Sequence, residues 1–122
     1  MISRVWYVTV YVRDFQRAVD FYQNTIGLTL KFADEQFGYA SFATDGAGFS
    51  VARVGEEQAS LVGGNTGIGL ATDDLDAEYA TLAAKGVEFT MAPSDQPWGG
   101  RLATFVDPEG NEIVLDKFDE NR

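Results

Sequence analysis

The chain has 122 residues, of which 45% are hydrophobic, and it contains neither His nor Cys. This length predicts a single compact domain with its own core, and the lack of Cys excludes disulfides, thiolate metal sites and thiol nucleophiles. Nine Lys and Arg against nineteen Asp and Glu give a net charge of -10, which disfavours nucleic acid and anionic membranes as partners. No stretch reaches the roughly 18 apolar residues of a membrane span, so we expect a cytoplasmic protein.

The first half of the chain predicts a strand, a helix and three further strands. Residues 5–12 are rich in Val and Tyr, and they are followed by Asp14, a residue typical of a helix N-cap. Apolar residues then recur at helical spacing up to Gly27, which is expected to end the helix. Three extended segments come next, at residues 28–33, 37–44 and 48–54.

The second half repeats this order after a polar connector at residues 56–64. A shift of 60 residues pairs Asp14 with Asp74, so the second predicted helix has the same cap, and its apolar face recurs as well. Gly27 pairs with Gly86 after a shortening by one residue, and the closing strands pair at an offset of 64. A cap, an apolar face, a terminal glycine and a closing strand that recur in order indicate an internal duplication. We therefore predict an α+β fold of two tandem βαβββ modules.

Two segments of the chain carry a family resemblance. VxVRDFxxAVDFYxxxIGL in the first module and WGGRLATFVDPEGNEIVL near the end resemble the vicinal oxygen chelate superfamily, which includes glyoxalase I, extradiol dioxygenases and bleomycin-resistance proteins. The resemblance covers nearly the whole chain. It implies that module one (1–55) and module two (65–118), joined by the linker (56–64) within a single domain (1–122), each curl into a half-barrel-like mixed sheet with the helix outside. One such scaffold serves many activities, so the function has to be argued from the site.

Relatives that resemble glyoxalase I hold a metal ion on the first and last strands of each module. The resemblance places these positions at Tyr7, Ser50, Gly67 and Val114. None of these side chains is a usual ligand of a divalent transition metal, so the resemblance implies that the family's metal site is absent, and we expect no cofactor. Glu112 and Asp116 share the strand parity of Val114, which leaves open an all-oxygen site for a hard cation such as magnesium.

The surface predicted for the cavity is rich in aromatic rings and hydroxyl groups. Val residues of the first strand should face the helix, while the alternate residues face the cavity: Tyr7, Thr9 and Tyr11. The other candidate ligand-binding residues are Phe37, Tyr39, Phe42, Ser50, Trp98, Arg101, Phe105, Glu112 and Val114. Stacking and cation–π contacts with such rings contribute about 0.5 to 2 kcal/mol each, which suits a planar or cationic ligand. The alternative for Phe42 and Phe105 is that they fill the core, and the alternative for Arg101 is a pair with a surface carboxylate.

These features lead to the hypothesis of a metal-independent small-molecule binding protein, similar to bleomycin-resistance proteins, that sequesters a planar or cationic aromatic compound such as an antibiotic. The alternative is a lyase, isomerase or dioxygenase-like enzyme that uses carboxylates, with Glu112 as the catalytic candidate, or an oxygen-ligated metal in the same cavity. A third hypothesis is a regulatory or immunity partner of another protein. The resemblance also implies a homodimer, and it leaves open whether the modules pair within one chain or between chains.

Overall fold

The computed structural model describes residues 1–121, which divide along the chain into two compact units between Gly63 and Gly64. Over these residues each unit contains one main helix and one four-stranded sheet, in the order predicted for a βαβββ module. The predicted α+β fold of two tandem modules is therefore confirmed, and both sheets remain open. No helix in the described part of the chain is long and apolar enough to cross a membrane.

The first unit builds sheet A. Its elements are β1 (Tyr7–Val12), α1 (Phe15–Asp20), the π-helix η1 (Phe21–Thr25), β2 (Thr29–Asp34), β3 (Tyr39–Ala43), β4 (Gly48–Arg53) and the 3-10 helix η2 (Glu56–Leu61). The strands lie in the order β1-β4-β3-β2, with β1 parallel to β4 and the other neighbours antiparallel. The helix η2 lies within the predicted connector, where Glu56 forms an ion pair with Arg13.

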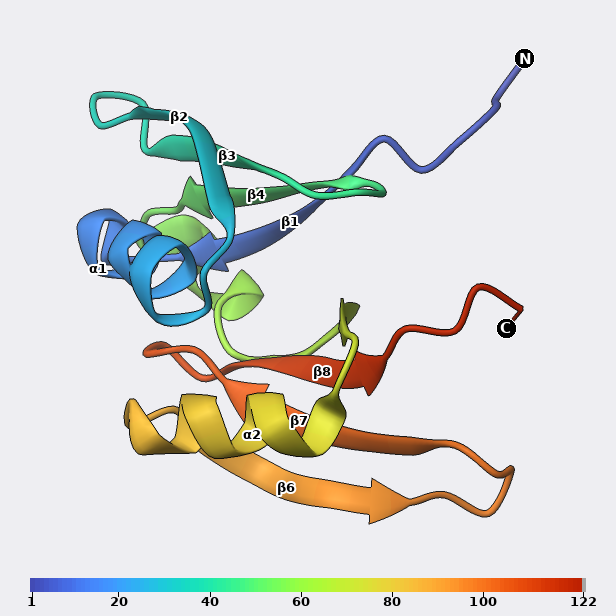
Figure 1. Cartoon of the computed structure of the whole chain (residues 1–122). Helices are drawn as coiled ribbons and strands as arrows, with labels where there is room; N and C mark the ends of the chain where they lie inside the picture. The colour runs from blue at the N-terminus through green and yellow to red at the C-terminus, as the bar shows by residue number, and fades with distance from the viewer. Residues whose placement is uncertain (122) are drawn as a thin grey trace. The chain divides into compact units, whose positions relative to one another are not determined.

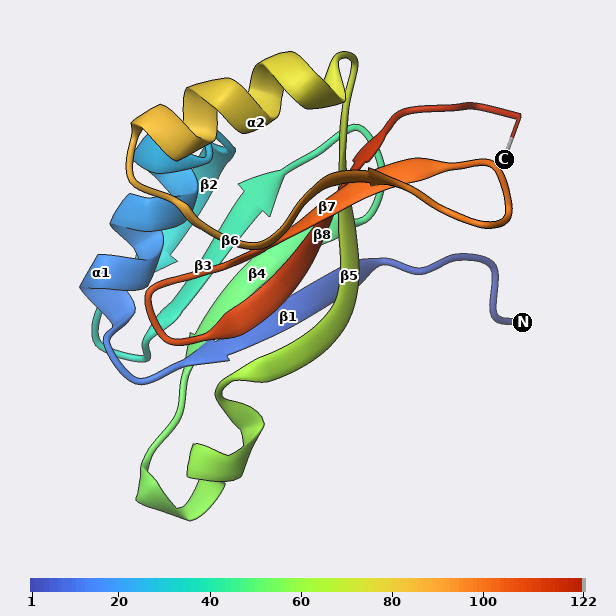
Figure 2. The same ribbon diagram turned by 90° about the horizontal axis from the view of Figure 1, so that it is seen from below.

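The second unit builds sheet B with the same connectivity. Its elements are β5 (Gly64–Thr72), α2 (Leu75–Ala84), β6 (Glu88–Asp95), β7 (Arg101–Val106) and β8 (Asn111–Lys117). The strand order β5-β8-β7-β6 repeats that of sheet A, again with one parallel pair at the first strand. Figures 1 and 2 show each helix packed against one face of its own sheet, which leaves the other face of that sheet without a helix.

Both main helices begin at the aspartates predicted to cap them. The Asp14 carboxylate accepts a hydrogen bond from the backbone N–H of Arg17 at 3.2 Å, and Asp74 accepts one from Ala77 at 3.1 Å. Each bond satisfies an N–H that the first turn of a helix otherwise leaves without an intrahelical acceptor. The two copies of the module therefore start their helices by the same local chemistry.

The helix of the first unit differs from the predicted continuous helix. After six residues of α1 the chain widens into η1, where the N–H of Ile26 donates to the carbonyl of Phe21 at 2.9 Å, five residues back. The helix α2 has no such segment. Gly27 and Gly86 follow the two helical segments with φ angles of 93° and 91°, the left-handed conformation that suits a glycine at a helix end.

The core of each unit lies between its helix and its sheet. In the first unit Tyr22 is fully buried, with its ring 4.8 Å from that of Phe49 and 6.4 Å from that of Phe42. The Val residues predicted to face the helix, Val10 and Val12, are buried beside them. The buried apolar residues of the second unit are Leu75, Leu82, Val87, Ala103, Phe105, Ile113 and Leu115. A functional surface on either sheet must therefore lie on the face away from the helix.

Candidate functional site

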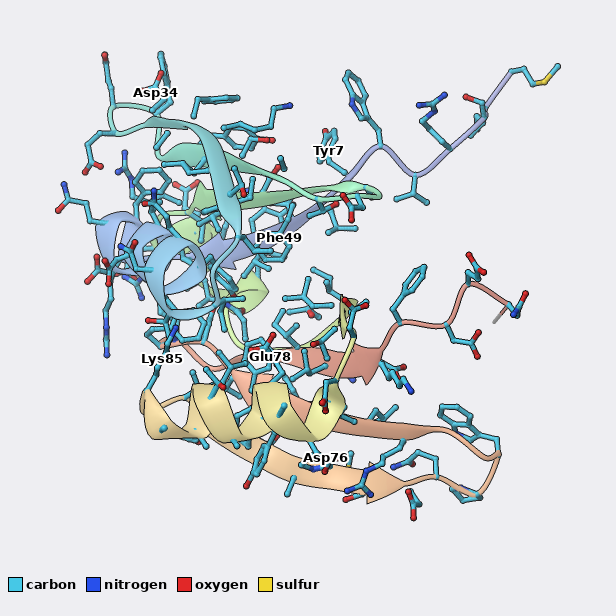
Figure 3. All side chains as sticks on the ribbon, viewed as in Figure 1. Tyr7, Asp34, Phe49, Asp76, Glu78 and Lys85 are labelled. Carbon is cyan, nitrogen blue, oxygen red and sulfur yellow. The ribbon has the colours of Figure 1, made fainter. Side chains whose placement is uncertain are left out.

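The open face of sheet A carries the alternate residues of β1. Tyr7, Thr9 and Tyr11 alternate with Val residues, of which Val10 and Val12 are buried, and Tyr7 is 54% exposed. The parallel pairing of Thr9 with Ser50 puts Ser50 of β4 on the same face. Figure 3 shows Tyr7 and Phe49 on opposite sides of the sheet, with Phe49 on the helix side. The predicted alternation along β1 is therefore observed.

Tyr39 of β3 lies on this open face and is fixed by a hydrogen bond. Its hydroxyl lies 2.8 Å from Oγ of Ser50, which is only 1% exposed. The ring of Tyr39 also lies 6.0 Å from that of Phe32, on the neighbouring strand β2. Phe32 is 51% exposed, so this pair presents one anchored ring and one accessible ring on the same face.

Phe32 was not among the predicted site residues, and a β-bulge explains why. The pairing of β2 with β3 shifts between Leu30 and Phe32, so Leu30 lies opposite Phe42 whereas Phe32 lies opposite Ser41. Simple alternation along β2 would place Leu30 and Phe32 on the same face. The bulge inserts one residue and turns Phe32 to the open face. The spacing of Leu30 and Phe32 in the sequence does not indicate that a bulge changes the register between them.

We define the aromatic face of sheet A as the side chains of Tyr7, Tyr11, Phe32 and Tyr39. Two further aromatic residues lie near it along the chain. Trp6 is exposed, and its ring meets that of Tyr7 edge-on at 5.9 Å.

Phe37 is exposed in the turn between β2 and β3. In that turn, labelled at Asp34 in Figure 3, the Asp34 carboxylate accepts the N–H of Phe37 at 3.1 Å. The turn is thus tied to the end of β2.

Two of the predicted ligand-binding aromatics lie on the other face. Phe42 and Phe105 are both 0% exposed, and each shares the helix-facing side of its sheet. Phe42 packs against Tyr22 and Phe49, and Phe105 lies 5.9 Å from the ring of Phe89. The structure supports the alternative that these two residues fill the core, so neither belongs to the candidate site.

The open face of sheet B is formed by polar and aliphatic side chains. Glu112 and Val114 of β8 lie opposite Val106 and Thr104 of β7, and both are half-buried. Oγ1 of Thr90 lies 3.0 Å from Oε2 of Glu112 and 2.6 Å from Oγ1 of Thr104. The shared strand parity of Glu112, Val114 and Asp116 is observed, and the two threonines are site residues that sequence reasoning missed.

Gly67 lies in an irregular stretch of β5. The pairing with β8 shifts between Asn65 and Gly69, and Gly67 has a φ angle of 72°. The side-chain oxygen of Asn65 accepts the N–H of Gly67 at 2.8 Å, and Thr66 donates its hydroxyl to the carbonyl of Glu112 at 2.7 Å. The position therefore serves the backbone geometry of the strand.

The positions of the family's metal ligands do not fit a transition metal here. Gly67 has no side chain, Val114 is aliphatic, and Ser50 already shares a hydrogen bond with Tyr39. Imidazole, thiolate and carboxylate groups, which bind such metals at about 2.0 to 2.3 Å, are missing from all four positions. Across residues 1–121, no three Asp or Glu side chains gather in a group that could hold a metal ion.

Trp98 and Arg101 lie at the tip and base of the β6–β7 hairpin. The Trp98 ring is exposed and covers Gly100, where an added Cβ would lie 2.0 Å from the ring. Arg101 donates to Asp76 at 2.8 and 3.2 Å and to Asp95 at 3.1 Å.

The guanidinium of Arg101 holds the pKa of the Asp76 carboxyl below its usual value by direct hydrogen bonding, and the pKa of Arg101 is raised in turn by Asp76 and Asp95. Asp76 lies at the first turn of α2, as labelled in Figure 3. Of the two predicted roles for Arg101, the carboxylate pair is the one observed.

A small open groove lies on the helix side of the first unit, with a volume of about 180 Å³. Its lining comes from α1, η1, β2 and the turn that follows β2, and includes Phe15, Val19, Asp20 and Glu35. None of the predicted site residues lines this groove. It is also much smaller than the roughly 300 to 1,000 Å³ of usual ligand pockets, so the open sheet faces remain the candidate surfaces.

Comparisons with known proteins agree with the fold. The chain is 30% identical over 121 residues to the uncharacterized protein YraH of Bacillus subtilis (strain 168), covering 90% of this chain and 94% of the relative. It is 37% identical to a glyoxalase/bleomycin resistance protein/dioxygenase superfamily member from Sphaerobacter thermophilus DSM 20745, with a TM-score of 0.80 and coverage of 97% and 99%. TnmS3, an antibiotic binding protein from Streptomyces sp. CB03234, is 35% identical, with a TM-score of 0.76 and coverage of 97% and 98%. The model of the Glyoxalase/Bleomycin resistance protein/Dioxygenase superfamily matches residues 4–115, and the chain belongs to this superfamily.

Proposed function

We propose that this protein binds and sequesters a planar or cationic aromatic small molecule such as an antibiotic, without chemical conversion. The observation that carries the proposal is the aromatic face of sheet A, where half-exposed rings gather on the side of the sheet that has no helix. The likeness to the antibiotic binding protein TnmS3 supports the same class of function. Sequestration requires affinity alone, so it makes no demand for a nucleophile or a catalytic base.

The aromatic face suits stacking because its rings are held in place. Tyr39 is fixed by its hydrogen bond to Ser50, and Phe32 leans against it at 6.0 Å. Rings that are already ordered lose little conformational freedom when a ligand binds, which favours affinity. Each aromatic pair contributes about 0.5 to 1.5 kcal/mol beyond the apolar area that it buries, so several rings together favour the binding of a flat molecule.

We also propose that binding is independent of a metal ion and that the protein acts as a homodimer. The first proposal rests on the donor groups missing from the family's ligand positions, Tyr7, Ser50, Gly67 and Val114. The second rests on the resemblance to bleomycin-resistance proteins. Light scattering coupled to size-exclusion chromatography measures the mass of the particle, and a particle of 13.3 kDa would contradict the dimer.

The experiment uses the planar dye acridine as a neutral probe, followed by its fluorescence on titration with protein. We expect saturable binding that persists after treatment with EDTA, with less than stoichiometric metal by elemental analysis. Phe32→Ala should weaken binding about three- to tenfold through loss of a stacked ring.

The matched control is Phe37→Ala, which removes an exposed ring of the β2–β3 turn outside the aromatic face. It should change the affinity less than Phe32→Ala does. Loss of binding on metal removal, or steady conversion of the bound dye, would contradict the proposal.

A further inference from the structure

Three side chains form a hydrogen-bonded chain across the open face of sheet B. Thr90 of β6 lies between Thr104 of β7 and Glu112 of β8, with oxygen–oxygen distances of 2.6 Å and 3.0 Å. A threonine hydroxyl has a single proton, whereas an ionised carboxylate accepts hydrogen bonds only. The number of protons in the chain therefore fixes the direction in which they point.

The hydroxyl of Thr90 donates its hydrogen bond to the carboxylate of Glu112. Glu112 has no proton to give, so the contact at 3.0 Å is a hydrogen bond only if Thr90 donates. The other acceptor within reach of this hydroxyl is the carbonyl of Thr104 at 3.4 Å, which is longer and uncharged. With the Thr90 proton used, the contact with Thr104 requires that Thr104 donates to Thr90.

Both hydroxyl protons thus point along the chain toward Glu112, and the groups left to a ligand are acceptors. Oγ1 of Thr104 keeps its lone pairs, and Oε1 of Glu112 accepts from no other group among residues 1–121. Val114, the cross-strand neighbour of Thr104, provides an aliphatic surface beside them. A surface of acceptors with one negative charge binds an ammonium group well and binds a carboxylate poorly.

We infer that the Thr104–Thr90–Glu112 chain on the open face of sheet B binds a protonated amine, and that it selects against anionic groups. The inference concerns the second unit by itself and rests on the proposed function, since it gives the chemical class of a small molecule that the protein takes up. It also gives Glu112 a role in binding in place of acid–base catalysis.

The test compares three acridines that share one ring system: cationic 9-aminoacridine, neutral acridine and anionic acridine-9-carboxylate. Affinities come from dye fluorescence and calorimetry at neutral pH and fixed salt. We expect 9-aminoacridine to bind at least tenfold more tightly than the carboxylate. Glu112→Gln should weaken 9-aminoacridine about tenfold and leave acridine unchanged, because a charge-assisted hydrogen bond is lost.

The control for overall charge is Glu57→Gln, which removes the same charge from the exposed helix η2. It should change every affinity less than twofold, because exposed charges are screened over about 8 to 10 Å in physiological salt. Thr90→Val tests the proton direction, since the hydroxyl proton of Thr104 then loses its acceptor and can turn outward. We expect this variant to bind acridine-9-carboxylate more tightly than the wild type does.

The outcomes separate this inference from the proposed function. Equal effects of Glu112→Gln and Glu57→Gln on 9-aminoacridine would overturn the inference, while weaker binding of all three dyes to Phe32→Ala would still support the aromatic face. Failure of all three dyes to bind the wild type would overturn both proposals. Circular dichroism and thermal unfolding establish that each variant is folded.

Discussion

The hydroxyl of Tyr39 lies 2.8 Å from Oγ of Ser50, on the neighbouring strand of sheet A. Ser50 is almost completely buried, so this tyrosine satisfies a hydroxyl that solvent does not reach. The same bond holds the Tyr39 ring in the aromatic face. A single contact therefore links the stability of the first unit to the geometry of its proposed binding surface.

The first prediction concerns this bond. Tyr39→Phe keeps the ring and removes its hydroxyl, which leaves Oγ of Ser50 buried without its partner. The free energy of unfolding should fall by about 1 to 3 kcal/mol, measured by urea denaturation. The double variant Tyr39→Phe with Ser50→Ala should recover part of the loss, because no hydroxyl is then left unpaired. Equal stability of Tyr39→Phe and wild type would show that the bond contributes nothing.

A second prediction uses two phenylalanines on opposite faces of sheet A. Phe42→Ala should lower the free energy of unfolding by about 3 to 5 kcal/mol, since it opens a cavity beside Tyr22 and Phe49. Phe32→Ala removes a ring that is about half exposed, so it should cost far less stability while it weakens dye binding. Thermal unfolding and acridine titration of both variants measure the contrast. A similar loss of stability in the two would contradict the assignment of faces.

The third prediction concerns the irregular stretch of β5. Gly67→Ala should destabilise the fold by about 1 kcal/mol or more, because the φ angle of 72° is strained for any residue with a Cβ. The matched control is Gly69→Ala, at a glycine with ordinary φ and open space around an added Cβ. That variant should be neutral or slightly stabilising. Urea denaturation distinguishes the two, and equal costs would refute the role given to Gly67.

The fourth prediction concerns the pH response of the Arg101 pair. Hydrogen bonding to Arg101 lowers the pKa of Asp76 from its usual 3.8. This effect is larger than the opposing effect of desolvation, which raises the pKa. A pKa that is lower in the folded protein than in the unfolded chain adds stability above pH 3.8, and this contribution disappears as the pH falls through the lowered value. Arg101→Gln should return the pKa of Asp76 toward 3.8, as measured by NMR titration of its carboxyl carbon. An unchanged titration curve would show that the guanidinium is not its cause.

Local signals in the sequence predict much of this fold. The caps at Asp14 and Asp74 and the glycines that end the helices depend on residues a few positions apart, so single-sequence reasoning finds them. The internal repeat then supplies the order of the elements twice. The alternation along β1 follows in the same way from its Val and Tyr residues.

The faces of individual strands are harder to predict, because they depend on register. The bulge in β2 puts Phe32 on the open face, and the irregular stretch around Gly67 interrupts the pairing of β5 with β8. Phe42 and Phe105 are of a residue type that often stacks on ligands, yet the register with their neighbouring strands puts both on the helix side of their sheets. The hydrogen-bonded chain of Thr104, Thr90 and Glu112 joins residues from three strands, so no pattern among neighbouring residues predicts it.

The π-helix η1 explains the one-residue difference between the two copies of the module. Tyr22 and Leu82 are equivalent buried residues 60 positions apart, whereas the terminal glycines Gly27 and Gly86 are 59 apart. The first copy therefore holds one additional residue between its last buried helical position and its glycine, and the wide turn closed by Ile26 and Phe21 accommodates it. One additional residue is thus accommodated inside a helix rather than in a loop. Removing Gln23, which is exposed, should convert this turn to an ordinary α-helical one and give the two copies the same spacing.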